Sequence, residues 1–214
     1  MRFHLKFARY LVASFAVFSM STLQAGSYDD FFRAVSRDDV AEVSGLLARG
    51  FDPNSPDENG QPALTRALRD HADKVAAVLL QQRALKVDAA NNAGETPLMI
   101  AALQGDKDWC ERLLQRGSRV DRSGWSPLHY AASGPDPATV ELLLKHGAGI
   151  DARSPNGTTP LMMAARYGSS AAAELLLARG ADPRLRNDLG LAATDFARMA
   201  EREALAERLA AASR

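Results

Sequence analysis

Three histidines and one cysteine are the side chains best suited to acid–base, nucleophilic or metal chemistry after the first 25 residues of this sequence. His71, His129 and His146 form no HExxH pair, and no two of them are spaced to share one helical face as metal ligands. No recurring nucleophile or carboxylate accompanies them, as a catalytic base would require. The sequence also lacks a phosphate-binding glycine loop and a nucleophile elbow. We therefore expect no enzyme activity, no catalytic or metal site and no cofactor.

Cys110 is the single cysteine, so this chain alone can form neither an intramolecular disulfide nor a thiolate metal cluster. It follows Trp109 in a segment that we expect to be helical. We interpret it as a small buried hydrophobic residue, because a lone exposed thiol is a liability in an oxidising compartment. A redox-sensitive thiol is the alternative interpretation.

The composition predicts a folded domain without a strong preference for charged partners. Hydrophobic residues occupy 46% of the 214 positions and charged residues 24%, which argues against a disordered or membrane-embedded chain. The 26 basic side chains balance 26 acidic ones, so no long-range field attracts nucleic acid or an anionic membrane surface. We therefore expect no nucleic-acid partner.

The first 25 residues have the pattern of a signal peptide. Arg2, Lys6 and Arg9 precede an apolar run over residues 10–20 that is too short to span a bilayer as a helix. Ala25 then supplies the small residue that signal peptidase needs. We expect cleavage after Ala25 and export to the periplasm, or secretion, with no stable membrane anchor afterwards. The alternative is an anchor that is never cut.

An internal repeat predicts the helices and turns that position the histidines and the cysteine. The segments ETPLMIAALQGD, WSPLHYAASGPD and TTPLMMAARYGS align without gaps through their first halves, and each follows a glycine. A second apolar segment with a leucine pair and a closing glycine lies downstream of each. The opening glycines, at positions 60, 94, 124, 157 and 190, recur at intervals of 34, 30, 33 and 33 residues. Such a period indicates a repeat architecture.

This pattern resembles ankyrin repeats from about Tyr28 to the C-terminus. The copy opened by Gly60 is degenerate, reading GQPALTRAL, and the two terminal segments would be caps with one outer face toward water. The resemblance implies an all-α solenoid of about five to six helix-turn-helix repeats with short β-turn fingers. The expected repeats span residues 28–59, 60–93, 94–123, 124–156, 157–189 and 190–214.

Short motifs explain the expected helix ends. The hydroxyl residues before Pro97, Pro127 and Pro160 can cap free amides, and a proline at the first helical position loses no hydrogen bond. The glycines after the leucine pairs suit a left-handed helix terminus. We expect His129 to bond neighbouring loop backbone, as the family's histidine does, and His146 to lie in the last turn of a helix. His71 replaces a turn glycine and is expected to be exposed.

Ankyrin proteins usually grip a partner with the finger tips and the exposed side of the first helices, and the repeat register carries those positions onto this chain. They are Asn92, Ala93, Glu95, Leu103, Gln104, Ser123, Trp125, Ser133, Asn156, Thr158, Arg166 and Tyr167. We expect Trp125, Arg166 and Tyr167 to form one aromatic and cationic patch, because large aromatics and arginine are the usual anchors of interfaces. The alternative for Trp125 is that it merely covers a shortened finger.

That shortened finger is where the sequence departs most from the family pattern. Six residues (118–123) separate Gly117 from Gly124, whereas nine separate Gly147 from Gly157. The SGPDP turn beside it contains two prolines. This departure is either an adaptation to a partner or neutral drift, and the sequence leaves both open.

The leading functional hypothesis is a non-catalytic, monomeric scaffold that binds a partner protein through its concave face and finger loops in an extracytoplasmic compartment. The alternative is a stress-protective accessory factor for a redox enzyme such as a catalase or peroxidase, a role that some exported bacterial ankyrin proteins resemble. The sequence names neither partner.

Overall fold

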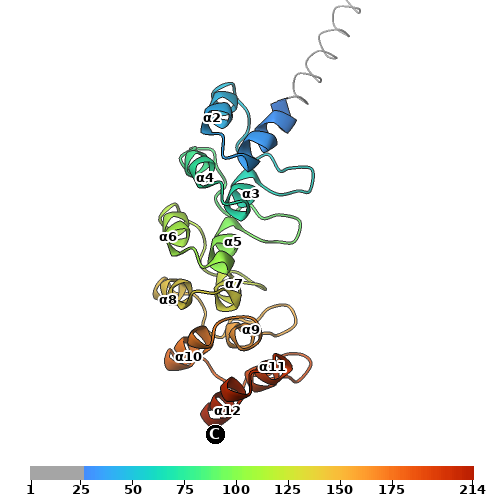
Figure 1. The fold of residues 1–214 in the computed structure, drawn as a ribbon, viewed down its shortest axis with the longest axis vertical. Coiled ribbons are helices and arrows are strands. Elements are labelled where there is room, and N and C mark those ends of the chain that lie inside the picture. The colour runs from blue at the N-terminus through green and yellow to red at the C-terminus, as the bar shows by residue number, and fades with distance from the viewer. Residues whose placement is uncertain (1–26) are drawn as a thin grey trace, which may run out of the picture.

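A computed structural model describes residues 27–214 as a single-file stack of helical hairpins (Figure 1). The predicted signal peptide lies outside the described residues. The hairpins pair residues 27–36 with α2 (Val40–Ala48), α3 (Ala63–Arg69) with α4 (Asp73–Leu80), α5 (Pro97–Gln104) with α6 (Lys107–Gln115), α7 (Pro127–Ser133) with α8 (Pro137–Lys145), α9 (Pro160–Arg166) with α10 (Ser170–Ala178), and α11 (Ala193–Met199) with α12 (Glu203–Ala212). One hairpin therefore falls within each predicted repeat, and the predicted helical solenoid is confirmed.

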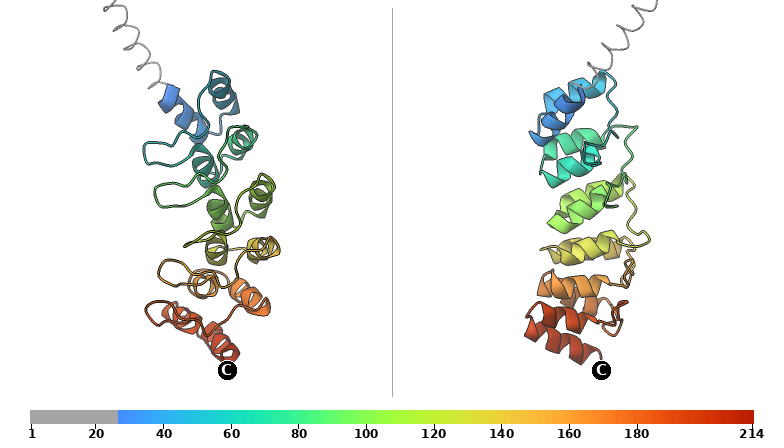
Figure 2. Two further views of the ribbon diagram at one scale, coloured as in Figure 1. Left: turned by 180° about the vertical axis from the view of Figure 1, so that it is seen from behind. Right: turned by 90° about the vertical axis from the view of Figure 1, so that its right-hand side faces the viewer.

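The hairpins form two layers of helices. The first helices of the repeats, α3, α5, α7, α9 and α11, pack on one another in sequence order and make the inner layer. The second helices make the outer layer, and the loops between repeats project sideways beyond the inner layer (Figure 2). Among the described residues, extended pairing is limited to one isolated bridge between Pro56 and Pro62.

Hydroxyl residues and prolines begin the three central inner helices, α5, α7 and α9, as the sequence predicts. Pro97, Pro127 and Pro160 each open their helix. The hydroxyls of Thr96 and Thr159 accept from the amides three residues later, each over 3.4 Å. Ser126 differs, because its hydroxyl pairs with the ring of His129.

The core is a continuous stripe of leucine and alanine along the stack. Leu98, Leu128 and Leu161 on the inner helices are fully buried, as are Leu113, Leu143 and Leu176 on the outer helices. Pairs of buried alanines, such as Ala131 and Ala132, occupy the faces between successive inner helices. Small side chains there let neighbouring hairpins approach closely, so each repeat buries its apolar face only against its neighbours.

Two inter-helix turns pass so close to the preceding inner helix that only glycine fits. A Cβ atom on Gly168 would lie 1.9 Å from the carbonyl oxygen of Ala132, and one on Gly134 would lie 2.8 Å from that of Leu103. Both contacts are with backbone, which cannot swing aside as a flexible side chain would. The SGPDP turn is therefore fixed from both ends, by Gly134 against the preceding repeat and by Pro137 at the start of α8.

The shortened finger is closed differently from its neighbours. A backbone hydrogen bond closes each of the other four fingers, from residues 57, 91, 154 and 187 to the carbonyl oxygen four residues later. Within the described chain, residues 118–124 make no such bond. Instead, the Arg122 Nη1 donates to the carbonyl oxygen of Gly94 in the preceding finger over 2.7 Å. The short finger is thus tied to its neighbour by a side chain.

Candidate functional site: a groove on the inner helices

An apolar groove of about 410 Å³ opens on the inner layer across three consecutive repeats. Its lining comes from α5, α7 and α9 and the loops beside them: Leu103, Trp125, His129, Tyr130, Ser133, Met163 and Tyr167. Leu103 and Tyr167 are 40% and 61% exposed, which is unusual for large apolar side chains in a folded domain. The groove is therefore a surface from which a second molecule can exclude water.

His129 is a structural member of the groove wall. It is fully buried; its Nε2 lies 3.0 Å from the carbonyl oxygen of Thr158, and its Nδ1 lies 3.1 Å from the amide nitrogen and 2.8 Å from the hydroxyl of Ser126. Because a carbonyl only accepts, Nε2 carries the proton and Nδ1 is the acceptor. Burial lowers the pKa of His129 below its ordinary value. The predicted bond to neighbouring loop backbone is confirmed, and both ring nitrogens are already occupied.

The remaining polar side chains of the groove are also bonded internally. Ser133 donates its hydroxyl to the carbonyl oxygen of His129 over 2.9 Å. Tyr130 donates to Glu95 over 3.4 Å, and burial followed by the Glu95 charge raises the pKa of this phenol. The groove thus offers apolar surface and few free hydrogen-bonding groups.

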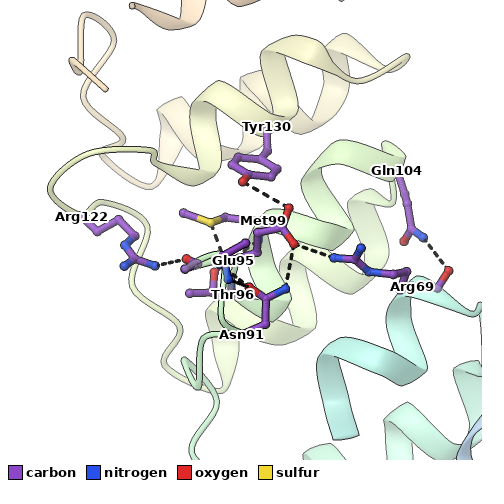
Figure 3. A network of polar contacts seen from close by, with 10 residues as sticks. Arg69, Asn91, Glu95, Thr96, Met99, Gln104, Arg122 and Tyr130 are labelled. Carbon is purple, nitrogen blue, oxygen red and sulfur yellow. Dashed lines mark hydrogen bonds and ion pairs between the residues drawn. The ribbon is translucent and has the colours of Figure 1, made fainter. Parts of the chain in front are cut away.

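Glu95 is the centre of a network that joins two inner helices (Figure 3). It accepts from Arg69 over 2.6 Å, from Asn91 over 2.8 Å and from Tyr130. Burial alone would raise the pKa of Glu95, but the bonds from Asn91 and Arg69 outweigh it and hold this pKa below its ordinary value. Glu95 is therefore ionised and neutralised by Arg69.

Trp125 packs on the groove wall and also lines the groove. Its indole packs edge-on against the His129 ring, with 5.3 Å between ring centroids, so part of it covers the wall beneath the shortened finger. The side chain is half-buried, and its remaining surface lines the groove. Trp125 therefore has a packing contact and also surface that is open to the groove.

Arg166 and Tyr167 lie together at the far edge of the groove. The Arg166 guanidinium carbon is 5.3 Å from the Tyr167 ring centroid, and its Nε donates to the Tyr167 hydroxyl over 3.0 Å. The Nη1 of Arg166 is buried and has no hydrogen-bond partner among the described residues. The guanidinium thus retains unused donor capacity beside an exposed aromatic ring.

The structure brings together only part of the predicted site. Leu103, Trp125, Ser133 and Tyr167 line the groove, with Arg166 beside it. Asn92 donates its amide to the carbonyl oxygen of Asn59 in the preceding finger. Ala93, Ser123 and Asn156 are exposed on the fingers, away from the groove lining.

Three of the predicted positions have internal roles. The Gln104 amide donates to the carbonyl oxygens of Leu68 and Arg69, capping the end of α3, and Glu95 belongs to the network described above. The expectation that Thr158 is accessible is wrong. It is 2% exposed, because its backbone is held by Ser154 and His129 at the base of the finger.

Two groove residues were not predicted from the sequence. Tyr130 and Met163 both lie three residues after the proline that opens their helix, at the same register position. Their shared register position could have indicated a common role. The register alone does not show which face of a short helix the next repeat leaves uncovered.

The other reactive side chains have structural positions. Cys110 is fully buried beside Trp109, whose Nε1 donates to Asp73 over 2.7 Å. Burial, with smaller effects of Asp106 and Glu111, raises the pKa of Cys110 to about 12, so the predicted buried thiol is confirmed.

His71 is exposed at a turn with φ of +56°, as predicted. His146 follows the last turn of α8 and bonds the Leu142 carbonyl over 2.9 Å.

Neither a metal centre nor a membrane span is found in the described part of the chain. Residues 27–214 contain no group of three or more His, Cys, Asp or Glu side chains placed to hold a metal ion. The same residues contain no helix with the length and apolar character needed to cross a bilayer.

A stack of helical hairpins with an open apolar groove on its inner layer defines a helical-repeat binding solenoid. The family model for ankyrin repeats (three copies) matches residues 31–123 and 110–187, together more than half of the chain. The chain belongs to the ankyrin-repeat family, whose members generally act as non-enzymatic scaffolds for protein–protein interaction.

Its similarity to curated proteins is confined to their repeat regions. Neurogenic locus notch homolog protein 2 of Homo sapiens is 35% identical over 119 residues, 54% of this chain and 5% of that protein. Transient receptor potential cation channel subfamily A member 1 of Homo sapiens is 29% identical over 117 residues, 53% of this chain and 10% of that protein. The homolog of this channel in Caenorhabditis elegans is 34% identical over 105 residues, 48% of this chain and 9% of that protein. The chain thus spans at most a tenth of the length of these relatives.

Proposed function

We propose that this protein is a non-catalytic scaffold that binds a partner protein through the groove on its inner helices, in an extracytoplasmic compartment. The observation that carries the proposal is the groove itself. It gathers exposed Leu103 and Tyr167 and half-buried Trp125 from three repeats, while the polar groups between them are already bonded. Aromatic and aliphatic side chains grouped in this way are the usual anchors of protein interfaces.

The pKa directions and bonding partners favour binding over chemistry. His129 is held neutral with both nitrogens occupied, Cys110 is a buried thiol, and Glu95 is paired with Arg69. A general base or nucleophile needs a free lone pair facing a substrate, and none of these groups offers one. The family membership points the same way.

The extracytoplasmic location rests on the basic and apolar N-terminal pattern that ends at Ala25. It also suits the burial of Cys110, because a fully buried thiol is protected from oxidation in an oxidising compartment.

Site-specific photo-crosslinking in intact cells tests the binding proposal. A photoreactive phenylalanine analogue at Tyr167 in the groove is compared with the same analogue at Ala178, an exposed position at the end of α10 in the outer layer. We expect a defined crosslinked protein from Tyr167 and none from Ala178, identified by mass spectrometry. Equal capture from both positions, or capture from neither, would count against the groove as the binding site.

A further inference from the structure

We infer that the groove binds one amphipathic α-helix of the partner, with an apolar stripe flanked by carboxylates. This rests on the proposed function and specifies its partner. Four observations lead to it: a row of exposed apolar residues along the inner layer, the small number of free hydrogen-bonding groups in the groove, two arginines beside it that form no ion pair, and the charge of the chain's own N-terminal segment.

The first observation is the position of the exposed apolar residues. Of the four large hydrophobic side chains that are exposed in the described chain, Leu103, Tyr167 and Met199 lie at the C-terminal ends of α5, α9 and α11. They follow one another along the inner layer, and the groove fills the interval between the first two. The row crosses four successive inner helices, which are spaced by about 8–10 Å. An occupant that covers it spans roughly 24–30 Å, the length of about 16–20 helical residues at 1.5 Å per residue.

The second observation distinguishes a helix from an extended segment. An extended chain leaves its backbone amides and carbonyls to be satisfied by the surface that it covers. In the groove, the polar side chains of His129, Ser133 and Tyr130 are already bonded within the protein. A helix satisfies its own backbone and presents side chains at i, i+3, i+4 and i+7, which is the arrangement an apolar groove accepts.

The third observation gives the charge of the helix. Arg122 and Arg166 donate to neutral oxygens, the Gly94 carbonyl and the Tyr167 hydroxyl, and neither forms an ion pair within the described residues. The Arg122 charge acts on Tyr130 of the groove, where it partly offsets the rise in the pKa of this phenol. Glu95, the acid that Tyr130 of the groove contacts, is already neutralised by Arg69. Two uncompensated guanidinium groups beside an apolar groove favour carboxylates on the flanks of the occupant.

The two arginines also exclude the chain's own N-terminal segment as the occupant. That segment is apolar over residues 10–20 but carries Arg2, Lys6 and Arg9 and no acid before the apolar run. Its basic groups would face Arg122 and Arg166. The partner helix therefore belongs to another protein.

Fluorescence anisotropy with designed peptides tests this inference on the full chain. The probe is an 18-residue labelled helix with leucine and phenylalanine at i, i+3, i+4 and i+7, a spacing repeated along its whole length, and with glutamate on both flanks. Three controls differ from it by one property each: lysine replaces glutamate, the order is scrambled so that no stripe forms, or central prolines prevent the helix. We expect the glutamate helix to bind at least about tenfold more tightly than each control, and its affinity to fall as salt rises.

Arginine variants place the binding in the groove. Arg166→Gln and Arg122→Gln should each weaken the glutamate helix by at least about fivefold, because each removes a charge-assisted hydrogen bond. Arg83→Gln is the matched control, since Arg83 is an exposed arginine outside the groove lining, and it should change the affinity less than twofold. Thermal melting shows whether each variant is folded, and a variant that has lost its fold is replaced by Tyr167→Ala, which should weaken binding similarly.

Several results would overturn the inference. Equal affinity for the glutamate and lysine helices would remove the charge argument, and tighter binding of the proline-containing peptide would show that the occupant is extended. Concentration-dependent dimerisation that Tyr167→Ala abolishes would show that a second copy of this chain covers the groove. If Tyr167 crosslinks a partner in cells but the glutamate helix does not bind, only the helix inference fails. If Tyr167 captures nothing in cells, the proposed function fails instead.

Discussion

His129 illustrates how, at the scale of single residues, a potentially reactive side chain is committed to structure. Its ring joins the start of α7 to the carbonyl of Thr158 at the base of the next finger, so one side chain connects two repeats. Trp125 packs on this ring and also lines the groove. Stability and the proposed binding therefore both depend on these two neighbouring residues, and each dependence has a measurable consequence.

The first prediction concerns the pH dependence of stability. Burial lowers the pKa of His129, so between the lowered value and 6.5 the unfolded chain binds a proton that the folded chain excludes. The free energy of unfolding should therefore decrease as the pH falls from 7.5 to 5.5. The His129→Gln side chain can still donate to the Thr158 carbonyl but does not titrate. The free energy of unfolding of this variant should therefore change less between pH 7.5 and 5.5. At pH 7.5 the variant should be less stable than the wild type.

Urea denaturation at the two pH values measures this difference. The Glu95 pKa is held below its ordinary value of 4.5, so the contribution of this carboxylate is present above pH 4.5 and does not enter the interval. A variant that loses as much stability as the wild type between pH 7.5 and 5.5 would show that His129 is not the responsible group.

The second prediction concerns Trp125. Trp125→Ala should weaken binding of the partner that crosslinks at Tyr167 by about 2 kcal/mol or more, roughly thirtyfold in affinity, because it removes an aromatic anchor. Isothermal titration calorimetry gives the affinity, and a thermal melt gives the stability. Lost stability with unchanged affinity would show that Trp125 only covers the finger.

At the scale of helices and turns, the shape of the stack depends on how closely each turn approaches the preceding inner helix. The end of α9 is an example of contact between adjacent repeats. Arg202 of the last repeat donates to the carbonyl oxygens of Ala164, Ala165 and Gly168. Gln104 caps α3 in the same manner from the next repeat. Side chains and glycines of one repeat thus complete the helix ends of its neighbour.

The third prediction compares two glycines. Gly168→Ala places a methyl group 1.9 Å from the carbonyl oxygen of Ala132 and should cost about 1–3 kcal/mol of stability, as overpacking usually does. Gly45 lies inside α2, where an added Cβ meets only the flexible Arg49 side chain at 3.6 Å. Gly45→Ala should instead stabilise by up to about 1 kcal/mol, the difference in helix propensity. Urea denaturation of both variants measures the effects, and equal changes would contradict the close approach at Gly168.

At the scale of the whole molecule, a solenoid buries its core only between neighbouring repeats and leaves a long inner face open to a partner. The described chain has an N-terminal cap in which the Phe31 ring contacts those of Phe32 and Phe51, and a C-terminal cap that ends at α12. The groove lies between these caps, in the central repeats. The proposed extracytoplasmic location rests on the segment that precedes the first cap.

The fourth prediction concerns that segment. We expect the exported protein to begin at Gly26, because Ala25 closes the signal pattern. N-terminal sequencing of material from the periplasm or the medium measures the start directly. Ala25→Arg serves as the control, since it removes the small residue and should leave the segment uncut. A soluble cytoplasmic protein that begins at Met1 or Arg2 would contradict both the processing and the proposed location.

The sequence by itself determined the fold, because local chemistry repeats. A hydroxyl residue and a proline begin each central inner helix, and a left-handed glycine follows α2, α6, α8 and α10. The period between the opening glycines indicates the repeat architecture. It also placed His129 against a loop, Cys110 in the core and His71 on the surface. Each of these follows from a residue type and its place within one repeat.

Only the tertiary structure decided which predicted contact residues are free. Three residues at partner-binding register positions are not free. Glu95 and Gln104 form hydrogen bonds with residues of the preceding repeat, and Thr158 is buried. Tyr130 and Met163 enter the groove because the repeats on either side leave them uncovered. Contacts between repeats depend on the distance between the backbones of adjacent hairpins. The shortened finger and the turn glycines change that distance locally. The sequence pattern within one repeat does not determine this distance. The sequence could therefore predict which face of the stack carries the groove, but not which residues on that face are free to contact a partner.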